Sequence, residues 1–481
     1  MKGFYCGIDL GSTSVKAAVF DAEGKLRGAG SCEYTLETPG PELVELDPEI
    51  YWLSVRAAVD KALRSADIAP YEVRSVGLTG QAETLILPDD RGIPLRKAIV
   101  WLDNRAVEEA AELEKAFGLE ELAALSGQTA VLPCWPAPKL LWVKRHEPEV
   151  FSHIGKVLMV EDFVAWKMTG EFHTSPGLLP STLYFDMRTK TWASKIFEYI
   201  GLPLSVLPEL SGSAPARELL PGAAVAVAPM DHICGHLGSG GGEGLVTECT
   251  GGSLALCAMT ERYLLDPQLR ISTYLGWREG DYALLPWAPT AGMMLRKFRD
   301  EFSGGMSYDQ LGEAAAAVPP GSDGLILLPH LAGAVSPTPA PQARGAVKGL
   351  TLAHTRGHFA RAIMESVAYL LRENAEALKA LGMELKCVRA LGGGAKSALW
   401  AQIKADVLKL PVSVGSCDEP VALGAAVLGA VAAGDFSSAS EAAKIMGGGE
   451  KIFTPGENAE RYEACYREYL KFNRYILGES K

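Results

Sequence analysis

The sequence predicts an α/β protein of two domains that are built on one plan, and three observations lead to this prediction. The chain has 481 residues, which is more than a single hydrophobic core usually holds. The stretch GIDLGSTSVKAAVFD at residues 7–21 predicts two alternating strands joined by a tight polar turn. A shorter copy, ECTGGS at residues 248–253, precedes two further alternating leucines, and internal repetition of this kind indicates a duplicated plan.

The turn of the first hairpin has the composition of a phosphate-binding site. Gly11, Ser12 and Thr13 are small, so their backbone N–H groups can converge on an anion without a side chain in the way. Lys16 follows the turn and can add a positive charge. Asp9 precedes it and can hold Mg2+ through water, because hard cations prefer oxygen ligands. The alternative interpretation is an ordinary hairpin with a Gly-Ser turn.

The second copy places Thr250, Gly251 and Gly252 in the same kind of turn. The spacing from the acidic residue to the final serine is equal in both copies. Two phosphate-binding turns that face each other across a cleft suit a nucleoside triphosphate better than a single phosphate, although a repeat this short can also arise by chance.

Composition and charge exclude several classes of protein. The formal net charge of -12 argues against a nucleic-acid partner, whose phosphates require a basic surface. The chain shows no signal peptide and no apolar run long enough to span a bilayer, so no membrane partner is expected. The nine cysteines are scattered and form no Cys-x-x-Cys pair, which favours a reducing, cytoplasmic location over a disulfide framework.

Polar residues follow two predicted strands of the N-terminal domain. A strand at 72–80 runs into Gln81 and Glu83, and a strand at 98–102 runs into Asp103. Such folds place ligands just past strand ends, and sugar hydroxyls require carboxylate and amide partners. We therefore predict that these three side chains bind a polyhydroxylated substrate. Solvated loop residues are the alternative.

Asp231 is the candidate general base. It follows an apolar strand at 223–228 and precedes the flexible, glycine-rich segment 238–244, where we place the domain boundary. Phosphoryl transfer to a hydroxyl needs a carboxylate that accepts the departing proton, and Asp231 is placed to do so at the cleft between the domains. An aspartate that merely caps the following helix is the alternative.

The C-terminal domain contains a candidate seat for a nucleotide. A strand at 387–391 ends in three glycines, and Ser397 can cap the helix that follows. A strand, a glycine turn and an exposed helix N-terminus suit a nucleotide, although a helix entry can need glycine for packing alone. No Gly-x-x-x-x-Gly-Lys-Ser/Thr motif is present, so this is not a P-loop protein. Helical spacing of apolar residues also predicts helices at 48–66, 106–117, 359–381 and 421–433.

Taken together, these residues resemble the FGGY family of carbohydrate kinases, within the superfamily of actin, hexokinase and heat-shock chaperone ATPases. The resemblance covers nearly the whole chain and rests on seven stretches: GIDLGSTSVKAAVFD, AIVWLDNR, TGEFHTSPGLLPSTLYFD, DGLILLPHLAG, RAIMESVAYLLREN, LGGGAKSALWAQIKADVLKLPV and EPVALGAA. It implies two ribonuclease-H-like domains with a central cleft. Residues 1–240 would bind the sugar and carry the catalytic base, and residues 241–481 would bind the nucleotide.

The resemblance also implies roles for individual residues. ATP and Mg2+ would bind in the cleft, with Asp9 and Asp231 serving the metal and Asp231 also acting as the base. The acceptor would contact Asp231 and the residues around the first two strand ends: Gln81, Ala82, Glu83, Trp101 and Asp103. The nucleotide would contact the two turns and the C-terminal glycine loop: Gly11, Ser12, Thr13, Lys16, Thr250, Gly251, Gly252, Gly393, Gly394, Ala395 and Ser397.

Departures from the family pattern leave the acceptor open. Ala82-Glu83 stands where xylulose kinases usually have Met-His and glycerol kinases Arg-Glu. We expect ATP-dependent phosphorylation of a small ketose such as xylulose, with glycerol, erythritol, another polyol or a tetrulose as alternatives. A catalytically silent, nucleotide-dependent interaction protein is the alternative from another class. Relatives are often dimers, so a homodimer is one expectation.

Overall fold

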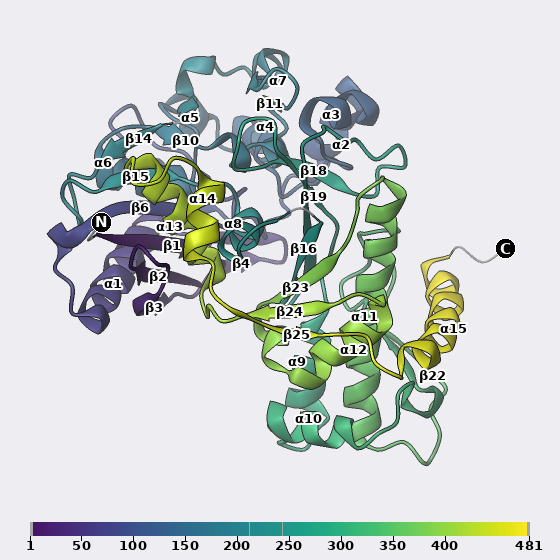
Figure 1. The fold of residues 1–481 in the computed structure, drawn as a ribbon. Coiled ribbons are helices and arrows are strands. Elements are labelled where there is room, and N and C mark those ends of the chain that lie inside the picture. The colour runs from purple at the N-terminus through teal and green to yellow at the C-terminus, as the bar shows by residue number, and fades with distance from the viewer. Residues whose placement is uncertain (1–2, 211, 243, 479–481) are drawn as a thin grey trace. The chain divides into compact units, whose positions relative to one another are not determined.

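The computed structural model describes residues 3–210, 212–242 and 244–478 (Figure 1). The chain forms two compact units. Unit 1 consists of Met1–Gly241, Glu261–Ala283 and Cys417–Gly448. Unit 2 consists of Gly242–Thr260, Leu284–Ser416 and Gly449–Lys481.

The units do not coincide with the expected division into residues 1–240 and 241–481. Unit 1 also takes in 261–283 and 417–448, so the chain passes between the units at five points, 241/242, 260/261, 283/284, 416/417 and 448/449. The expected hinge at 238–244 is therefore one connection among several, and its residue Glu243 lies outside the described residues.

The main sheet of unit 1 has the strand order β14-β15-β6-β1-β2-β3. β1 pairs antiparallel with β2, which confirms the first predicted hairpin, and β6 runs parallel to both β1 and β15. The carboxyl ends of β1, β6 and β15 therefore lie at one edge of the sheet. The strands are β1 (Phe4–Leu10), β2 (Ser14–Phe20), β3 (Leu26–Glu33), β6 (Val73–Gly80), β14 (Ser213–Pro215) and β15 (Ala224–Val227).

The two faces of this sheet are covered by different helices. Alternate residues of β1, from Cys6 to Leu10, pack in one core with α1 and α6. Tyr5 points to the opposite face and packs with α13 and α14. Figure 1 shows α1 beside β2 and β3, which it contacts most closely. The helices of unit 1 are α1 (Pro48–Ala66), α2 (Val107–Phe117), α3 (Leu119–Ser126), α4 (Pro136–His146), α5 (Pro148–Ser152), α6 (Val160–Thr169), α7 (Ser194–Ile200), α8 (Asp231–Gly238), α13 (Pro420–Ala432) and α14 (Ala439–Met446).

Glycines let α13 approach the sheet and α8 at van der Waals distance. A Cβ on Gly7 of β1 would lie 1.7 Å from the carbonyl oxygen of Ala422, and one on Gly424 would lie 1.9 Å from that of Cys234. Neither position has room for a larger residue, because a real Cβ atom never comes so close to backbone. The helix that begins at Asp231 is thus held against the sheet by a helix from the far end of the sequence.

A second sheet of unit 1 has the order β4-β5-β8-β7-β9. The expected strand at 98–102 is shorter, because the chain turns where the backbone N–H of Asp103 donates to the carbonyl of Val100 at 2.9 Å. The strands are β4 (Glu37–Gly40), β5 (Leu43–Leu46), β7 (Leu85–Ile86), β8 (Ala98–Ile99) and β9 (Leu158–Met159). Short strands elsewhere in unit 1 are β10 (His173–Thr174), β11 (Phe185–Asp186), β12 (Thr191–Trp192), β13 (Glu209–Leu210) and β18 (Ser272–Leu275).

Unit 2 repeats the opening of unit 1. β16 pairs antiparallel with β17 and parallel with β23, and β24 and β25 follow β23. The strands are β16 (Leu245–Thr250), β17 (Leu254–Thr260), β20 (Trp287–Ala288), β21 (Ile326–Leu328), β22 (Ala346–Lys348), β23 (Cys387–Leu391), β24 (Val412–Gly415) and β25 (Glu450–Phe453), while β19 (Tyr282–Leu285) spans a boundary between the units. The helices are α9 (Gly292–Glu301), α10 (Tyr308–Ala316), α11 (Arg356–Ala380), α12 (Ala398–Leu408) and α15 (Ala459–Leu477).

Single-turn 3-10 helices connect these elements: η1 (Pro70–Glu72), η2 (Pro176–Leu178), η3 (Pro180–Thr182), η4 (Leu204–Val206), η5 (Ser322–Gly324) and η6 (Gly393–Lys396). In the part of the chain that the structure describes, no helix is both long and apolar enough to cross a membrane.

Candidate active site

Asp231 lies where three strands of unit 1 end together. The segment before it is pinned to β6, because the Ala228 N–H donates to the Leu78 carbonyl at 2.7 Å and the Thr79 hydroxyl donates to the Pro229 carbonyl at 2.6 Å. Asp231 is the first residue of α8 and its carboxylate accepts from the N–H of His232 at 2.6 Å. Its side chain is 36% exposed, so part of the carboxylate stays available to a ligand.

Two further carboxyl groups lie within electrostatic range of Asp231. Burial raises the pKa of Asp9 to about 7, and the charge of Asp231 adds to the shift. Burial also raises the pKa of Glu83 to about 7, and Asp231 again contributes. Carboxylates that lie this close together favour a bound cation, and Mg2+ needs few carboxylates when phosphates complete its shell. Asp9 and Asp231 therefore fit the expected metal, although no group of three or more His, Cys, Asp or Glu ligands occurs among the described residues.

The first predicted phosphate turn joins β1 to β2. The N–H of Gly11 donates to the Ser14 carbonyl at 3.1 Å, which closes the turn, and Thr13 is exposed. Ser12 accepts a hydrogen bond from the indole N–H of Trp101 at 2.8 Å. Lys16 pairs with Glu419 at 3.2 Å and is half exposed, so its charge is shared with a carboxylate.

Residues 81–84, which we call the acceptor turn, follow β6 directly. Ala82 and Glu83 both have left-handed backbone conformations, with φ of 49° and 48°, which side chains rarely adopt. Lys139 is fully buried and donates from its Nζ to the carbonyl of Glu83 at 3.0 Å. Glu161, equally buried, accepts the N–H of Ala82 at 3.1 Å.

The acceptor turn and the phosphate turn are linked through Trp101. Its backbone N–H donates to the Thr84 hydroxyl at 3.1 Å, while its indole reaches Ser12. Burial raises the pKa of the Tyr34 and Tyr51 hydroxyls, and the nearby Gln81 amide opposes this shift, yet no described atom meets the geometry of a hydrogen bond to the Gln81 side chain. A buried amide without partners suits a polar ligand.

Asp103 lies in a different environment from the other predicted acceptor residues. Its side chain is fully buried and accepts from the Val44 N–H at 2.6 Å and from the Arg105 guanidinium at 2.7 and 2.8 Å. Arg105 also binds Glu45 at 2.7 Å. These contacts satisfy both carboxylate oxygens, and they join the segment after β8 to β5.

The second predicted phosphate turn lies in unit 2 at the N-terminus of α9. The carbonyl of Gly252 accepts the N–H groups of Ala291 at 2.8 Å and Met293 at 3.1 Å. The acid of this copy, Glu248, is fully buried and binds Lys404 at 2.5 Å. Lys404 also donates to the Thr250 hydroxyl at 3.0 Å, so a buried ion pair stabilises the turn.

The glycine loop after β23 lies against this turn. A Cβ on Gly394 would lie 2.8 Å from the Cβ of Thr250, so the loop has no room for a side chain there. Ser397 caps α12 as predicted, accepting the N–H of Trp400 at 3.2 Å. Unit 2 thus brings together Thr250 to Gly252 and Gly393 to Ser397, the two sets of residues predicted to bind the nucleotide.

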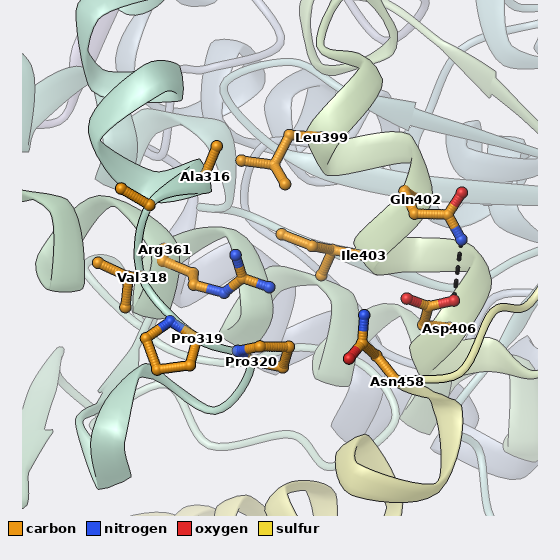
Figure 2. Close-up of a pocket in the computed structure, with 11 residues that line it drawn as sticks. Ala316, Val318, Pro319, Pro320, Arg361, Leu399, Gln402, Ile403, Asp406 and Asn458 are labelled. Carbon is orange, nitrogen blue, oxygen red and sulfur yellow. Dashed lines mark hydrogen bonds between the residues drawn. The ribbon is translucent and has the colours of Figure 1, made fainter.

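A separate pocket of about 420 Å³ lies in unit 2 between α10, α11, α12 and the start of α15. Figure 2 shows the apolar side chains of Leu399 and Ile403 facing it, with Arg361 and Asp406 at its polar parts. The described residues that line it do not include the glycine loop. Its polar groups are already engaged, since Arg361 binds Glu365 at 2.9 Å and Asp406 accepts from Gln402 at 2.9 Å.

Several residues of the site escaped the sequence analysis. Lys139, Glu161 and Lys404 are ionisable side chains buried in α4, α6 and α12. Each of these helices carries further charged residues, so no local pattern sets the three apart. No local pattern marks Tyr274 either. Its pKa is raised mainly by burial and then by the charge of Glu83, which places it beside the acceptor turn.

The fold defines a class of protein, an α/β protein whose two units open on one hairpin plan. Models of the FGGY family of carbohydrate kinases match the chain with their N-terminal domain over residues 4–227 and their C-terminal domain over 282–433. Xylulose kinase of Bacillus subtilis is 29% identical over 97% of this chain and 96% of its own. Glycerol kinase of Thermus brockianus is 34% identical over 97% of both.

Solved structures agree with the sequence comparisons. The crystal structure of xylulose kinase from Rhodospirillum rubrum is similar with a TM-score of 0.88 and 28% identity, over 98% of this chain and 99% of that one. A ligand-bound xylulose kinase from Lactobacillus acidophilus has a TM-score of 0.91 at 22% identity, over 99% of both chains.

The chain belongs to the FGGY family of carbohydrate kinases. It is an enzyme that transfers a phosphoryl group from ATP to a hydroxyl of a sugar or polyol. The expected two-domain α/β fold of the actin-like superfamily is confirmed.

Proposed function

We propose that Asp231 is the general base of this kinase and that its acceptor is a small uncharged ketose such as xylulose. One observation carries the proposal: Asp231 acts electrostatically on both Asp9 and Glu83, at the edge where β1, β6 and β15 end. A base must lie beside both the acceptor and the phosphate-binding groups, and this position is beside both.

The residues of unit 1 then have distinct tasks. The side chains of Glu83 and Gln81 exchange hydrogen bonds with the hydroxyls of the acceptor substrate, and Ala82 leaves space beside them. Trp101 joins the acceptor turn to the phosphate turn, so the hydroxyl and the phosphate are held in one frame. Asp231 takes the proton of the attacking hydroxyl.

Each unit would contribute its own nucleotide contacts. In unit 2, the turn at 250–252 would supply N–H groups to phosphates and residues 393–397 would border the nucleoside. In unit 1, the turn at 11–13 would supply N–H groups to a phosphate. Asp9 and Asp231 would hold Mg2+, which would supply positive charge to neutralise the phosphates.

The acidic residues around the acceptor turn favour an uncharged acceptor substrate. Asp9, Glu83 and Asp231 would repel a carboxylate substrate. Among the relatives, the proteins named xylulose kinase favour a ketose, and the 34% identity to a glycerol kinase keeps a polyol such as glycerol or erythritol, or a tetrulose, as the second candidate. The scattered cysteines support a cytoplasmic location, and a homodimer stays a prediction.

The test is an ADP-release screen across ketoses, aldoses and polyols, with the Asp231→Asn variant as control. We expect one uncharged acceptor to dominate and the variant to lose at least about 100-fold in kcat, the low end of general-base effects. Binding of ATP, measured by calorimetry, should be nearly unchanged in the variant. Near-normal turnover by Asp231→Asn would remove it from this role, and an intact ATP-binding protein that phosphorylates no acceptor would favour the silent interaction protein.

A further inference from the structure

Glu161 is a buried carboxyl group to which sequence reasoning assigned no role. It lies in the first turn of α6, its side chain is fully buried, and its Oε1 accepts the N–H of Ala82 at 3.1 Å. Its Oε2 is also buried and has no hydrogen-bond partner among the described residues. A buried carboxyl that makes a single contact is costly, so the contact that it makes is expected to matter.

That contact holds a strained part of the chain. Ala82 and Glu83 are consecutive residues in the left-handed region. Such a conformation is strained for residues other than glycine, and it persists only where the surroundings impose it. The Glu161 carboxyl accepts the N–H of Ala82, the first residue of the pair, and the Lys139 ammonium donates to the carbonyl of Glu83, the second residue. The two side chains come from different helices, α6 and α4, and together they hold the turn from both sides.

We propose that Glu161 is a positioning residue for the acceptor: by holding the Ala82 N–H it sets the backbone that presents Glu83 to the acceptor hydroxyls. This inference rests on the proposed assignment of the acceptor turn. Glu161 itself does not touch the acceptor, since its carboxyl is sealed from solvent beneath the turn.

The surroundings of Glu161 favour its uncharged form. The carboxyls of Asp162 and Glu83 and the hydroxyls of Tyr34 and Tyr51 are the titratable groups within electrostatic range of it. Burial raises the pKa of Glu161 to about 8, with the two carboxyls adding to the shift. At pH 7 the group keeps its proton. As the pH rises through 8 the group becomes a buried anion beside Glu83. The hydrogen bond from the Ala82 N–H favours the anion, but burial and the neighbouring carboxyls disfavour it more, so we expect the turn to loosen.

Two substitutions separate the contact from the charge. Glu161→Gln keeps an oxygen for the Ala82 N–H and cannot ionise, whereas Glu161→Ala removes the contact. We expect Glu161→Ala to raise the acceptor KM about 10-fold at pH 7, as for a lost buried hydrogen bond, with the ATP KM unchanged. Glu161→Gln should behave like the wild type at pH 7. Above pH 8 the acceptor KM should rise in the wild type and stay flat in Glu161→Gln.

Asp162→Asn is the matched control. Asp162 is the next residue of α6, is equally buried, and accepts the N–H of Met159 at 2.9 Å instead of one in the acceptor turn. It should leave the acceptor KM unchanged. Equal increases in the KM of acceptor and ATP in Glu161→Ala, or an alkaline rise that survives in Glu161→Gln, would overturn the proposal.

Amide hydrogen exchange gives a readout that does not need turnover. In peptides that contain Ala82, exchange at pH 7 should be faster in Glu161→Ala than in the wild type and Glu161→Gln. At pH 9 the wild type should exchange faster than Glu161→Gln. If no acceptor is phosphorylated but these differences appear, the proposed function fails while the role of Glu161 in the turn stands. If an acceptor is found but the differences are missing, only the inference fails.

Discussion

The two hairpin turns of this kinase share one backbone plan but treat their acidic residue in opposite ways. In both units an antiparallel hairpin carries the turn, and its first strand also pairs in parallel with the next strand of the sheet. Asp9 and Glu248 occupy matching places before the two turns. The repeat predicted from the sequence is therefore present in the backbone.

The difference lies in what each acid meets. Glu248 is sealed in unit 2 and neutralised by Lys404 at 2.5 Å, so it has a fixed partner. Burial and the charge of Asp231 raise the pKa of Asp9, and Lys16, the cation that opposes this shift, is itself paired with Glu419. A carboxyl without a dedicated cation can take a metal, whereas one that is already paired supports its own turn. A repeated motif can thus hold a structural residue in one copy and, as we propose for Asp9, a metal-binding residue in the other.

The largest effect should come from breaking the pair in unit 2. Lys404→Met leaves Glu248 buried and uncompensated, which is expected to lower the free energy of unfolding by about 3–5 kcal/mol. Urea unfolding followed by circular dichroism measures the loss. The double variant with Glu248→Gln should recover much of it. If Lys404→Met were as stable as the wild type, Glu248 would have no structural task, and the contrast with Asp9 would disappear.

The next effect should come from Asp9, and it should affect rate instead of stability. Asp9→Asn removes the negative charge of the carboxylate that we propose binds Mg2+. The kcat should therefore fall about 100-fold or more, since bound metals contribute several kcal/mol of charge stabilisation. Its stability without metal should equal or exceed that of the wild type above pH 7, because a carboxyl facing Asp231 has been neutralised. Steady-state kinetics over a range of Mg2+ concentrations gives the rate. A stable, fully active variant would contradict the metal assignment.

The smallest effect should come from the cap of α12. Ser397→Ala removes the side-chain oxygen that accepts the Trp400 N–H, and loss of such a cap costs about 1 kcal/mol. If residues 393–397 border the nucleoside, the ATP KM should rise a few-fold while the acceptor KM stays constant. Thermal unfolding and kinetics together test this. Ser307→Ala, which removes the cap of α10, is a matched control that should cost similar stability without changing the ATP KM.

The sequence foretold the local elements well because they are encoded locally. The helix at 48–66 and the strand at 387–391 have the bounds predicted from the sequence, and Ser397 caps α12 as predicted. Alternation, helical spacing and a capping serine act over a few residues, so one stretch of sequence is sufficient to read them. The two turns and the place of Asp231 after a strand were predicted from the same local patterns, and the roles assigned to them stay predictions.

What the sequence by itself determined is the set of elements, the pair of matching turns, and the residues that resemble those of carbohydrate kinases. Only the tertiary structure decided that α13 returns to unit 1, that Arg105 binds Glu45, 60 positions away, and that Glu248 is neutralised by Lys404, 156 positions away. These outcomes depend on which distant side chains share a buried space. Burial makes such side chains form an ion pair or shifts a pKa among them. No local sequence pattern shows which distant side chains will come together.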